Sequence, residues 1–171
     1  MEFSPSGGLL AYAAGMEVKL LEMDDVFGKP RVLAHDSGYA FNRVAFDPSG
    51  DQLAAVTHDT AVIWDVKSGE LKQNVTEKLG SGVALGTGVA FSPDGSVLAL
   101  GKRNGMVWRW DLESESSVAE LVGHTQSITS LAFAPDGSSL ASGSADGTSK
   151  LWDLSRERES APNLLEYVAQ K

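Results

Sequence analysis

Residues 123–154 read GHTQSITSLAFAPDGSSLASGSADGTSKLWDL, and two phrases from this stretch recur along the chain. The first phrase is a phenylalanine followed by a turn that contains proline and ends in glycine. It begins at four positions: Phe3, Phe46, Phe91 and Phe133. The second phrase is a Trp-Asp pair, and it begins at Trp64, Trp110 and Trp152. The phenylalanines are 43, 45 and 42 residues apart and the tryptophans 46 and 42. Because two unrelated phrases share one period, the chain is a repeat.

Each repeat has the pattern of antiparallel strands. An alternating run such as 128–133 precedes a turn in which proline presets its φ and glycine accepts a positive φ. A second apolar run and a turn at Asp146-Gly147 lead to a third strand that carries the Trp-Asp pair. A fourth, less regular strand such as 117–122 precedes the next unit. Four antiparallel strands in about 43 residues predict an all-β fold made of propeller blades.

The quoted phrases also resemble a known family. Gly123-His124, Pro135-Asp136-Gly137, Leu140-Ala141-Ser142-Gly143-Ser144 and Leu151-Trp152-Asp153 are similar to the signature of the WD-repeat (WD40) β-propellers. The resemblance covers nearly the whole chain, is closest in the fourth unit and is weakest in the first. It implies a single WD-repeat domain over 1–171, with blades at approximately 1–35, 36–79, 80–122 and 123–169.

The number of repeats raises the question of ring closure. Four four-stranded blades predict a WD40-type propeller segment that is incomplete or open relative to a ring of about seven blades. The first unit begins inside its first strand, and residues 163–168 are expected to form the outer strand of the fourth blade, with a short helix as the alternative. We expect a fragment of a longer propeller, or self-association or pairing with another propeller segment that closes the ring. An open or unusually small four-bladed ring is the third hypothesis.

The resemblance implies a hydrogen-bond network in the fourth blade. Its members are His124, Asp146, Ser142 and Trp152. An indole N–H buried between blades needs an acceptor, and a buried polar network is stable only when all its groups are paired. A Ser-His-Asp triad uses the same residue types, but Ser142 lies within a predicted strand and no Gly-x-Ser-x-Gly phrase surrounds it. We therefore expect a structural network and no catalytic residue.

The other units depart from this pattern. Asn104 stands at the aspartate position of the third unit, and no histidine precedes its first strand. In the second unit His35 can act with Asp59, although the turn before Trp64 is one residue shorter. Leu21 replaces the tryptophan of the first unit. These blades are expected to depend on apolar packing of Phe46, Phe91, Ile63 and Val107.

Composition excludes several kinds of site. Of the 171 residues, 42% are hydrophobic and 22% charged, and the formal net charge is −9. An acidic surface repels phosphate backbones and anionic lipid, so nucleic acid and membranes are disfavoured as partners. Without cysteine there is no disulfide or cysteine-based zinc site, and the three histidines lack metal-ligand spacing. We expect no metal and no cofactor. No secretory signal or apolar span of roughly 20 residues is visible, which predicts a cytoplasmic location with a nuclear one as the alternative.

Function is expected on the loops, because a propeller holds them on a rigid scaffold. Alignment with the fourth unit selects the residue before the motif aspartate and the residue two after the motif histidine. The resulting rim positions are Tyr39, His58, Arg103, Gln126 and Ala145. Tyrosine and arginine are enriched at binding hot spots.

The resemblance implies a non-catalytic protein-interaction scaffold or adaptor, as a subunit or fragment of a larger assembly. Its expected partners are other proteins. The alternative is a hydrolase-like propeller enzyme that uses the central channel. Such an enzyme needs converging carboxylates or histidines at the channel mouth, and the sequence does not show them.

Overall fold

The structure is a computed structural model that describes residues 1–33, 38–79 and 84–155. The first sheet consists of β1 (Glu2–Phe3), β2 (Leu9–Ala14), β3 (Glu17–Glu22) and β4 (Arg31–Leu33). The second consists of β5 (Arg43–Phe46), β6 (Gln52–Val56), β7 (Ala61–Asp65) and β8 (Leu71–Asn74). The third consists of β9 (Leu85–Phe91), β10 (Val97–Lys102), β11 (Val107–Asp111) and β12 (Ser116–Leu121). The fourth consists of β13 (Ile128–Phe133), β14 (Ser139–Ser144) and β15 (Ser149–Asp153).

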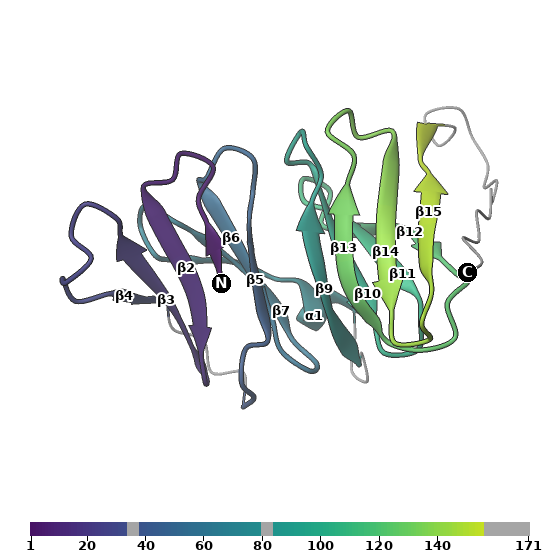
Figure 1. Cartoon of the computed structure of the whole chain (residues 1–171), viewed down its shortest axis with the longest axis horizontal. Helices are drawn as coiled ribbons and strands as arrows, with labels where there is room; N and C mark the ends of the chain where they lie inside the picture. The colour runs from purple at the N-terminus through teal and green to yellow at the C-terminus, as the bar shows by residue number, and fades with distance from the viewer. Residues whose placement is uncertain (34–37, 80–83, 156–171) are drawn as a thin grey trace.

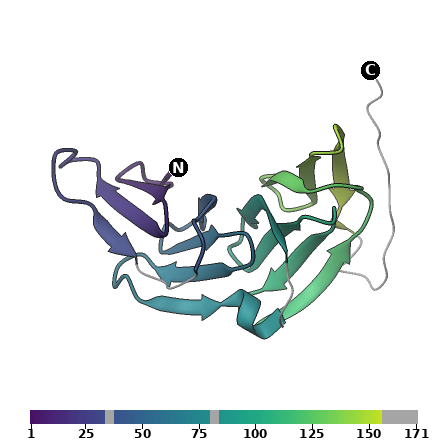
Figure 2. The ribbon, with the colours of Figure 1, turned by 90° about the horizontal axis from the view of Figure 1, so that it is seen from below.

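The sheets stand side by side in chain order (Figure 1). All strand pairs are antiparallel, and within each sheet the strands follow one another as in the sequence. Figure 2 shows the four sheets as an open arc, with the first and fourth sheets at its ends. The first strands of neighbouring sheets pack against one another along the inner side of this arc. The predicted all-β fold, an open segment of a propeller, is confirmed.

Strand register places the recurring phrases next to each other. In the second sheet Phe46 lies opposite Leu53, and Leu53 lies opposite Trp64. We call these three positions the large-residue row of a sheet. The rows of the other sheets are Phe3-Leu10-Leu21, Phe91-Leu98-Trp110 and Phe133-Leu140-Trp152. Directly opposed residues share a face of the sheet, so each row forms one ridge. Leu21 occupies the tryptophan position of the first sheet.

The adjacent positions form a second row on the opposite face, because side chains alternate along a strand. In the second sheet this row is Ala45-Ala54-Ile63, and we call it the alanine row. The alanine rows of the other sheets are Glu2-Ala11-Leu20, Ala90-Ala99-Arg109 and Ala132-Ala141-Leu151. Small side chains on one face leave room for the large ones of the next sheet.

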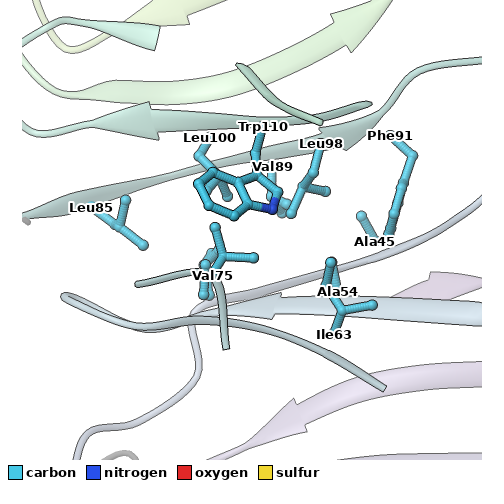
Figure 3. Packing of buried hydrophobic residues seen from close by; sticks show 12 residues of the cluster. Ala45, Ala54, Ile63, Val75, Leu85, Val89, Phe91, Leu98, Leu100 and Trp110 are labelled. Atoms are coloured by element: carbon cyan, nitrogen blue, oxygen red, sulfur yellow. The ribbon is translucent and has the colours of Figure 1, made fainter. Parts of the chain in front are cut away.

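The core consists of three apolar clusters, each between two neighbouring sheets. Between the second and third sheets, the alanine row Ala45-Ala54-Ile63 packs against Phe91, Leu98 and Trp110. Figure 3 shows the Trp110 indole in the middle of this cluster. The first and second sheets, and the third and fourth, pack in the same way. Phe46, Phe91, Ile63 and Val107 are all buried. Each sheet therefore needs its neighbours to bury its faces.

Two features lie outside the repeat pattern. The short helix α1 (Val75–Leu79) follows β8, where the repeat predicts only strand and loop. Val75, its first residue, is fully buried in the cluster between the second and third sheets, so this packing fixes the turn at that point. The outer strand expected at 163–168 lies outside the described residues, and within them the fourth sheet has three strands. No helix of the described part is long and apolar enough to cross a membrane.

Candidate interaction rim and its supporting hydrogen-bond network

Four polar side chains of the fourth sheet meet beside the turn that joins β14 to β15. His124 comes from the loop before β13, Ser142 from β14, Asp146 from the turn and Trp152 from β15. The turn is tight because Gly147 adopts a φ of +83°, a conformation that glycine tolerates best. Ser142 and Trp152 share one face of the sheet, since Trp152 pairs with Leu140 two residues before Ser142. The strand register thus positions the serine beside the indole.

These side chains form a continuous chain of hydrogen bonds. Trp152 Nε1 donates to Ser142 Oγ at 2.8 Å. The serine hydroxyl lies 2.9 Å from His124 Nε2, and His124 Nδ1 lies 2.9 Å from Asp146 Oδ2. The serine hydroxyl can accept from the indole and donate its own proton to Nε2. With a proton on Nδ1, the imidazole can donate to the carboxylate, so each donor of this chain has an acceptor.

Asp146 connects this network to the neighbouring loop. Thr148 donates its hydroxyl to Asp146 Oδ1 at 2.6 Å and its backbone N–H at 2.9 Å. The backbone N–H of Thr125 donates to Oδ2 at 2.9 Å. These bonds, above all the one from the Thr148 hydroxyl, hold the pKa of the Asp146 carboxyl well below its ordinary value. The ionised carboxylate thereby holds the loop that precedes β13.

The same distances would suit a Ser-His-Asp triad, but access differs. Ser142 is 3% exposed, and the His124 side chain is fully buried. The serine oxygen faces the indole N–H on one side and the imidazole on the other. A nucleophile must reach the carbonyl carbon that it attacks, and packing against the third sheet covers this oxygen. The arrangement can support a loop but cannot present Ser142 to a substrate.

The equivalent positions of the second and third sheets lack the serine. Register places Ala55 and Leu100 there. Trp64 Nε1 is buried without a hydrogen-bond partner, whereas Trp110 Nε1 lies 3.4 Å from Gln73 Oε1. Within the described ranges, the Asp59 and Asn104 side chains hydrogen-bond to residues of their own turns. His35 lies outside the described residues. Across the described ranges, the complete network occurs in the fourth sheet alone.

The expected rim residues lie along one edge of the arc. The ring centroids of Tyr39 and His58 are 5.5 Å apart, and Tyr39 is half exposed. Arg103, Gln126 and Ala145 are exposed on the following two sheets. These positions lie on successive loops and turns of the second, third and fourth sheets.

Backbone hydrogen bonds tie these positions to one another. His58 O accepts from Leu85 N at 2.7 Å, and Ala84 O accepts from Arg103 N at 3.0 Å. Further along, Ser144 Oγ donates to Gln126 O at 2.9 Å, and Ala145 N donates to Ser127 O at 2.8 Å. These bonds join the second sheet to the third at the rim and hold the Gln126 loop to the β14–β15 turn within the fourth.

Gly105 allows a close approach of two loops along the rim. Its φ is +87°, and a Cβ at this position would lie 2.3 Å from His124 O and 3.1 Å from Gln126 O. No L side chain fits there without moving the backbone. Glycine thus lets the turn that carries Arg103 lie directly on the loop that carries Gln126.

Sequence reasoning missed one aromatic contact near the rim. Lys102 Nζ lies 3.6 Å from the ring centroid of Trp108, a cation–π contact, and Trp108 Nε1 donates to the Glu120 carboxylate. The register equivalents of Trp108 are Val62 and Lys150. A second tryptophan two residues before the repeat tryptophan was the available signal. Among the described residues, no group of three histidines, aspartates or glutamates has a metal-binding arrangement.

Comparison with known families agrees with this geometry. The family described as WD domain, G-beta repeat matches residues 115–153. The resemblance to WD-repeat proteins predicted from the sequence is confirmed. The matched repeat begins just before β12, the outer strand of the third sheet, and ends with β15 in the fourth. This one WD repeat therefore contributes to two sheets.

Several WD-repeat relatives are similar to parts of the chain. Pre-mRNA-processing factor 19 of Bos taurus is 34% identical over 100 residues, which is 58% of this chain and 19% of the relative. Pre-mRNA-processing factor 19 homolog 2 of Arabidopsis thaliana is 28% identical over 151 residues, 74% of this chain and 28% of the relative. Small ribosomal subunit protein RACK1y of Oryza sativa is 33% identical over 110 residues, 63% of this chain and 32% of the relative. The chain thus spans less than a third of the length of each relative.

Proposed function

We propose that this WD-repeat chain is a non-catalytic protein-interaction scaffold and that its rim binds the partner. The observation that carries the proposal is the exposure of Tyr39, Arg103 and Gln126 along one edge, whose loops are held by backbone hydrogen bonds at His58, Arg103 and Ala145. Tyrosine and arginine contribute large contact areas and several hydrogen bonds, which is why binding hot spots are rich in them.

A fixed backbone favours binding at this edge. Ordering loops on association costs free energy, so a surface that is already ordered keeps more of its contact energy as affinity. The fourth-sheet network contributes here because Asp146 holds the backbone of Thr125, next to Gln126. In this proposal the polar network positions the rim and takes no part in chemistry.

The net charge and the relatives point to proteins as partners. A net charge of −9 disfavours a polyanionic ligand. The names of the relatives assign them to pre-mRNA processing and to the small ribosomal subunit. By analogy with those relatives, we propose that this chain is also a subunit of a larger assembly.

The test compares rim variants with variants of the opposite edge. The tagged chain is used to capture partners from a lysate, which are identified by mass spectrometry, and the affinity of a purified partner is then measured by calorimetry. Tyr39→Ala and Arg103→Ala are expected to weaken binding about tenfold or more. The matched controls are Phe27→Ala, an aromatic fully exposed in the loop between β3 and β4, and Lys67→Ala, a basic residue exposed between β7 and β8.

Two results would contradict the proposal. One is a partner whose affinity falls with Phe27→Ala or Lys67→Ala and not with the rim variants. The other is an equal loss of melting temperature and binding in the rim variants, which would assign Tyr39 and Arg103 to packing.

A further inference from the structure

The three internal contacts of the arc follow one rule. In each of them, the alanine row of one sheet faces the large-residue row of the next sheet. In the second sheet, for example, Phe46 is 6% exposed and Trp64 fully buried against the first sheet, while Ala54 and Ile63 are fully buried against the third. The two faces are complementary in size, because small side chains receive large ones.

At the two ends of the arc, one half of this contact is present on each outer face, and no residue within 1–33, 38–79 and 84–155 supplies the other half. The first sheet presents its large-residue row, in which Phe3 is 55% exposed and Leu10 and Leu21 are partly exposed. Tyr12, Lys19 and Val32 share this face by register. The fourth sheet presents its alanine row, in which Ala132 and Ala141 are exposed and Leu151 is 52% exposed. Both faces lie at the ends of the open arc (Figure 2).

The turns repeat the same rule independently. A Cβ at Gly50, Gly95 or Gly137 would lie 3.3 to 3.8 Å from the Cδ of a proline in the preceding sheet. The prolines concerned are Pro5, Pro48 and Pro93. At Gly7, the equivalent glycine of the first sheet, no atom lies within 4 Å of the Cβ position. Pro135 is the equivalent proline of the fourth sheet, and it would contact the turn glycine of a sheet that packs next in order.

We propose that a second copy of this chain docks head to tail on these faces. In this contact the row Phe3-Leu10-Leu21 of one copy packs on the row Ala132-Ala141-Leu151 of the other, and Pro135 meets Gly7. The inference is independent of the rim and of its partner. A second copy is the occupant because the required ridge, the required shallow face and the proline–glycine contact are all present on this one chain.

The symmetry of this contact limits the assemblies that it can form. Its two surfaces differ, so repeated docking closes into a ring or continues as a linear assembly, depending on the rotation per copy. Two copies whose ends both engage bury both pairs of end faces and leave no exposed row. A dimer is therefore the expected species.

The first experiment measures the oligomeric state of the full chain by sedimentation velocity over a series of dilutions. Leu151→Glu places a charge in the proposed contact and is expected to raise the dimer dissociation constant at least about 30-fold, since an unpaired buried charge is costly. The matched control is Leu71→Glu in β8, a strand leucine that is 44% exposed and lies on neither end face. Circular dichroism spectra of both variants establish that they fold.

The second experiment tests the head-to-tail direction by mixing. Phe3→Lys blocks the first-sheet face, and Leu151→Glu blocks the fourth-sheet face. Each variant alone is expected to be monomeric. The two together are expected to form a mixed dimer, because one intact contact remains and the other brings lysine opposite glutamate. Phe27→Lys serves as the control for a lysine in place of an exposed phenylalanine.

A wild-type chain that stays monomeric at every concentration would overturn the proposal. So would a dimer that Leu151→Glu and Leu71→Glu weaken equally, or a pair of monomeric variants that do not associate on mixing. Self-association that survives both end-face variants would place the contact elsewhere, and it would also contradict the proposal.

Discussion

The second and fourth sheets solve the same packing problem in different ways. Both place a tryptophan at the end of the large-residue row, and both bury it against the preceding sheet. In the fourth sheet, Ser142 Oγ accepts a hydrogen bond from the indole N–H of Trp152 and forms a second hydrogen bond with His124 Nε2. In the second sheet, Ala55 stands at that position and Trp64 Nε1 has no acceptor. The tryptophan position thus depends on apolar contact, and the polar network is an addition to it.

The largest expected loss of stability comes from removing Trp64, the tryptophan that is held by apolar contacts alone. Trp64→Ala is expected to lower the free energy of unfolding by about 3–5 kcal/mol, because it leaves a cavity between the first and second sheets. Chemical denaturation with a two-state fit measures the loss. Leu71→Ala in the neighbouring strand is the control, and an equal loss there would show that Trp64 is not the centre of this cluster.

The next effect concerns the serine itself. Ser142→Ala is expected to cost about 2–3 kcal/mol, because it leaves the indole N–H and His124 Nε2 buried without partners. The converse change, Ala55→Ser, is expected to alter stability by less than about 1 kcal/mol. Here the new bond to Trp64 is offset by burial of a hydroxyl whose own proton has no described acceptor. Denaturation of both variants compares the two sheets directly, and equal losses would contradict this account.

A smaller effect is the pH dependence of the free energy of unfolding that Asp146 of the fourth sheet contributes. The hydrogen bonds from Thr148, Thr125 and His124 lower the pKa of Asp146 in the folded chain below the ordinary value of 3.8, so the unfolded chain binds more protons in acid. Its stabilising contribution is therefore complete above about pH 4 and is lost as the pH falls further. We expect Asp146→Asn to make the free energy of unfolding less dependent on pH between about pH 4 and pH 2.

Ser142→Ala provides the control for this pH dependence. It keeps Asp146 and the bonds from Thr148 and Thr125, so its pH dependence is expected to follow that of the wild type. At the opposite edge, the Ser92 hydroxyl and the Ser96 backbone N–H lower the pKa of Asp94, and the Ser138 backbone N–H lowers that of Asp136. Part of the acid dependence therefore remains in every variant. A variant Asp146→Asn with an unchanged slope would show that Asp146 does not contribute.

The smallest expected effect on stability is at the rim. Tyr39→Ala and Arg103→Ala are expected to change the free energy of unfolding by less than about 0.5 kcal/mol. Both side chains lie at exposed positions beyond the packed rows. Thermal unfolding of these variants measures this, and a loss as large as that of Ser142→Ala would remove the distinction between rim and network.

Much of the difference between the sheets can be predicted from the sequence, because equivalent residues can be aligned from repeat to repeat. The spacing of Phe46, Phe91 and Phe133 predicts strand order and register, and the fold follows from them. Leu21 at the tryptophan position of the first sheet follows from the same alignment. The motif residues His124, Asp146, Ser142 and Trp152 are local to one repeat, so their proximity also follows from spacing.

Contacts between repeats could not be predicted in the same way. The contact of Gly105 with His124 O depends on how closely the third and fourth sheets approach. The helix α1 depends on Val75 entering a cluster formed by other sheets. Such features are set by the packing of neighbouring units, and a pattern within one unit does not contain them.

The offset between the matched repeat and the sheets has a further consequence. Residues 115–153 supply the outer strand of one sheet and three strands of the next. Duplicating or excising such a unit in an engineered chain would always cut through a sheet, and the junction would be repaired only if the neighbouring unit supplied the missing strand. Main-chain hydrogen bonds between paired strands therefore join each unit to the preceding one, in addition to the contacts between side chains. Unfolding of one repeat would therefore remove strands from two sheets, which couples the stability of adjacent sheets.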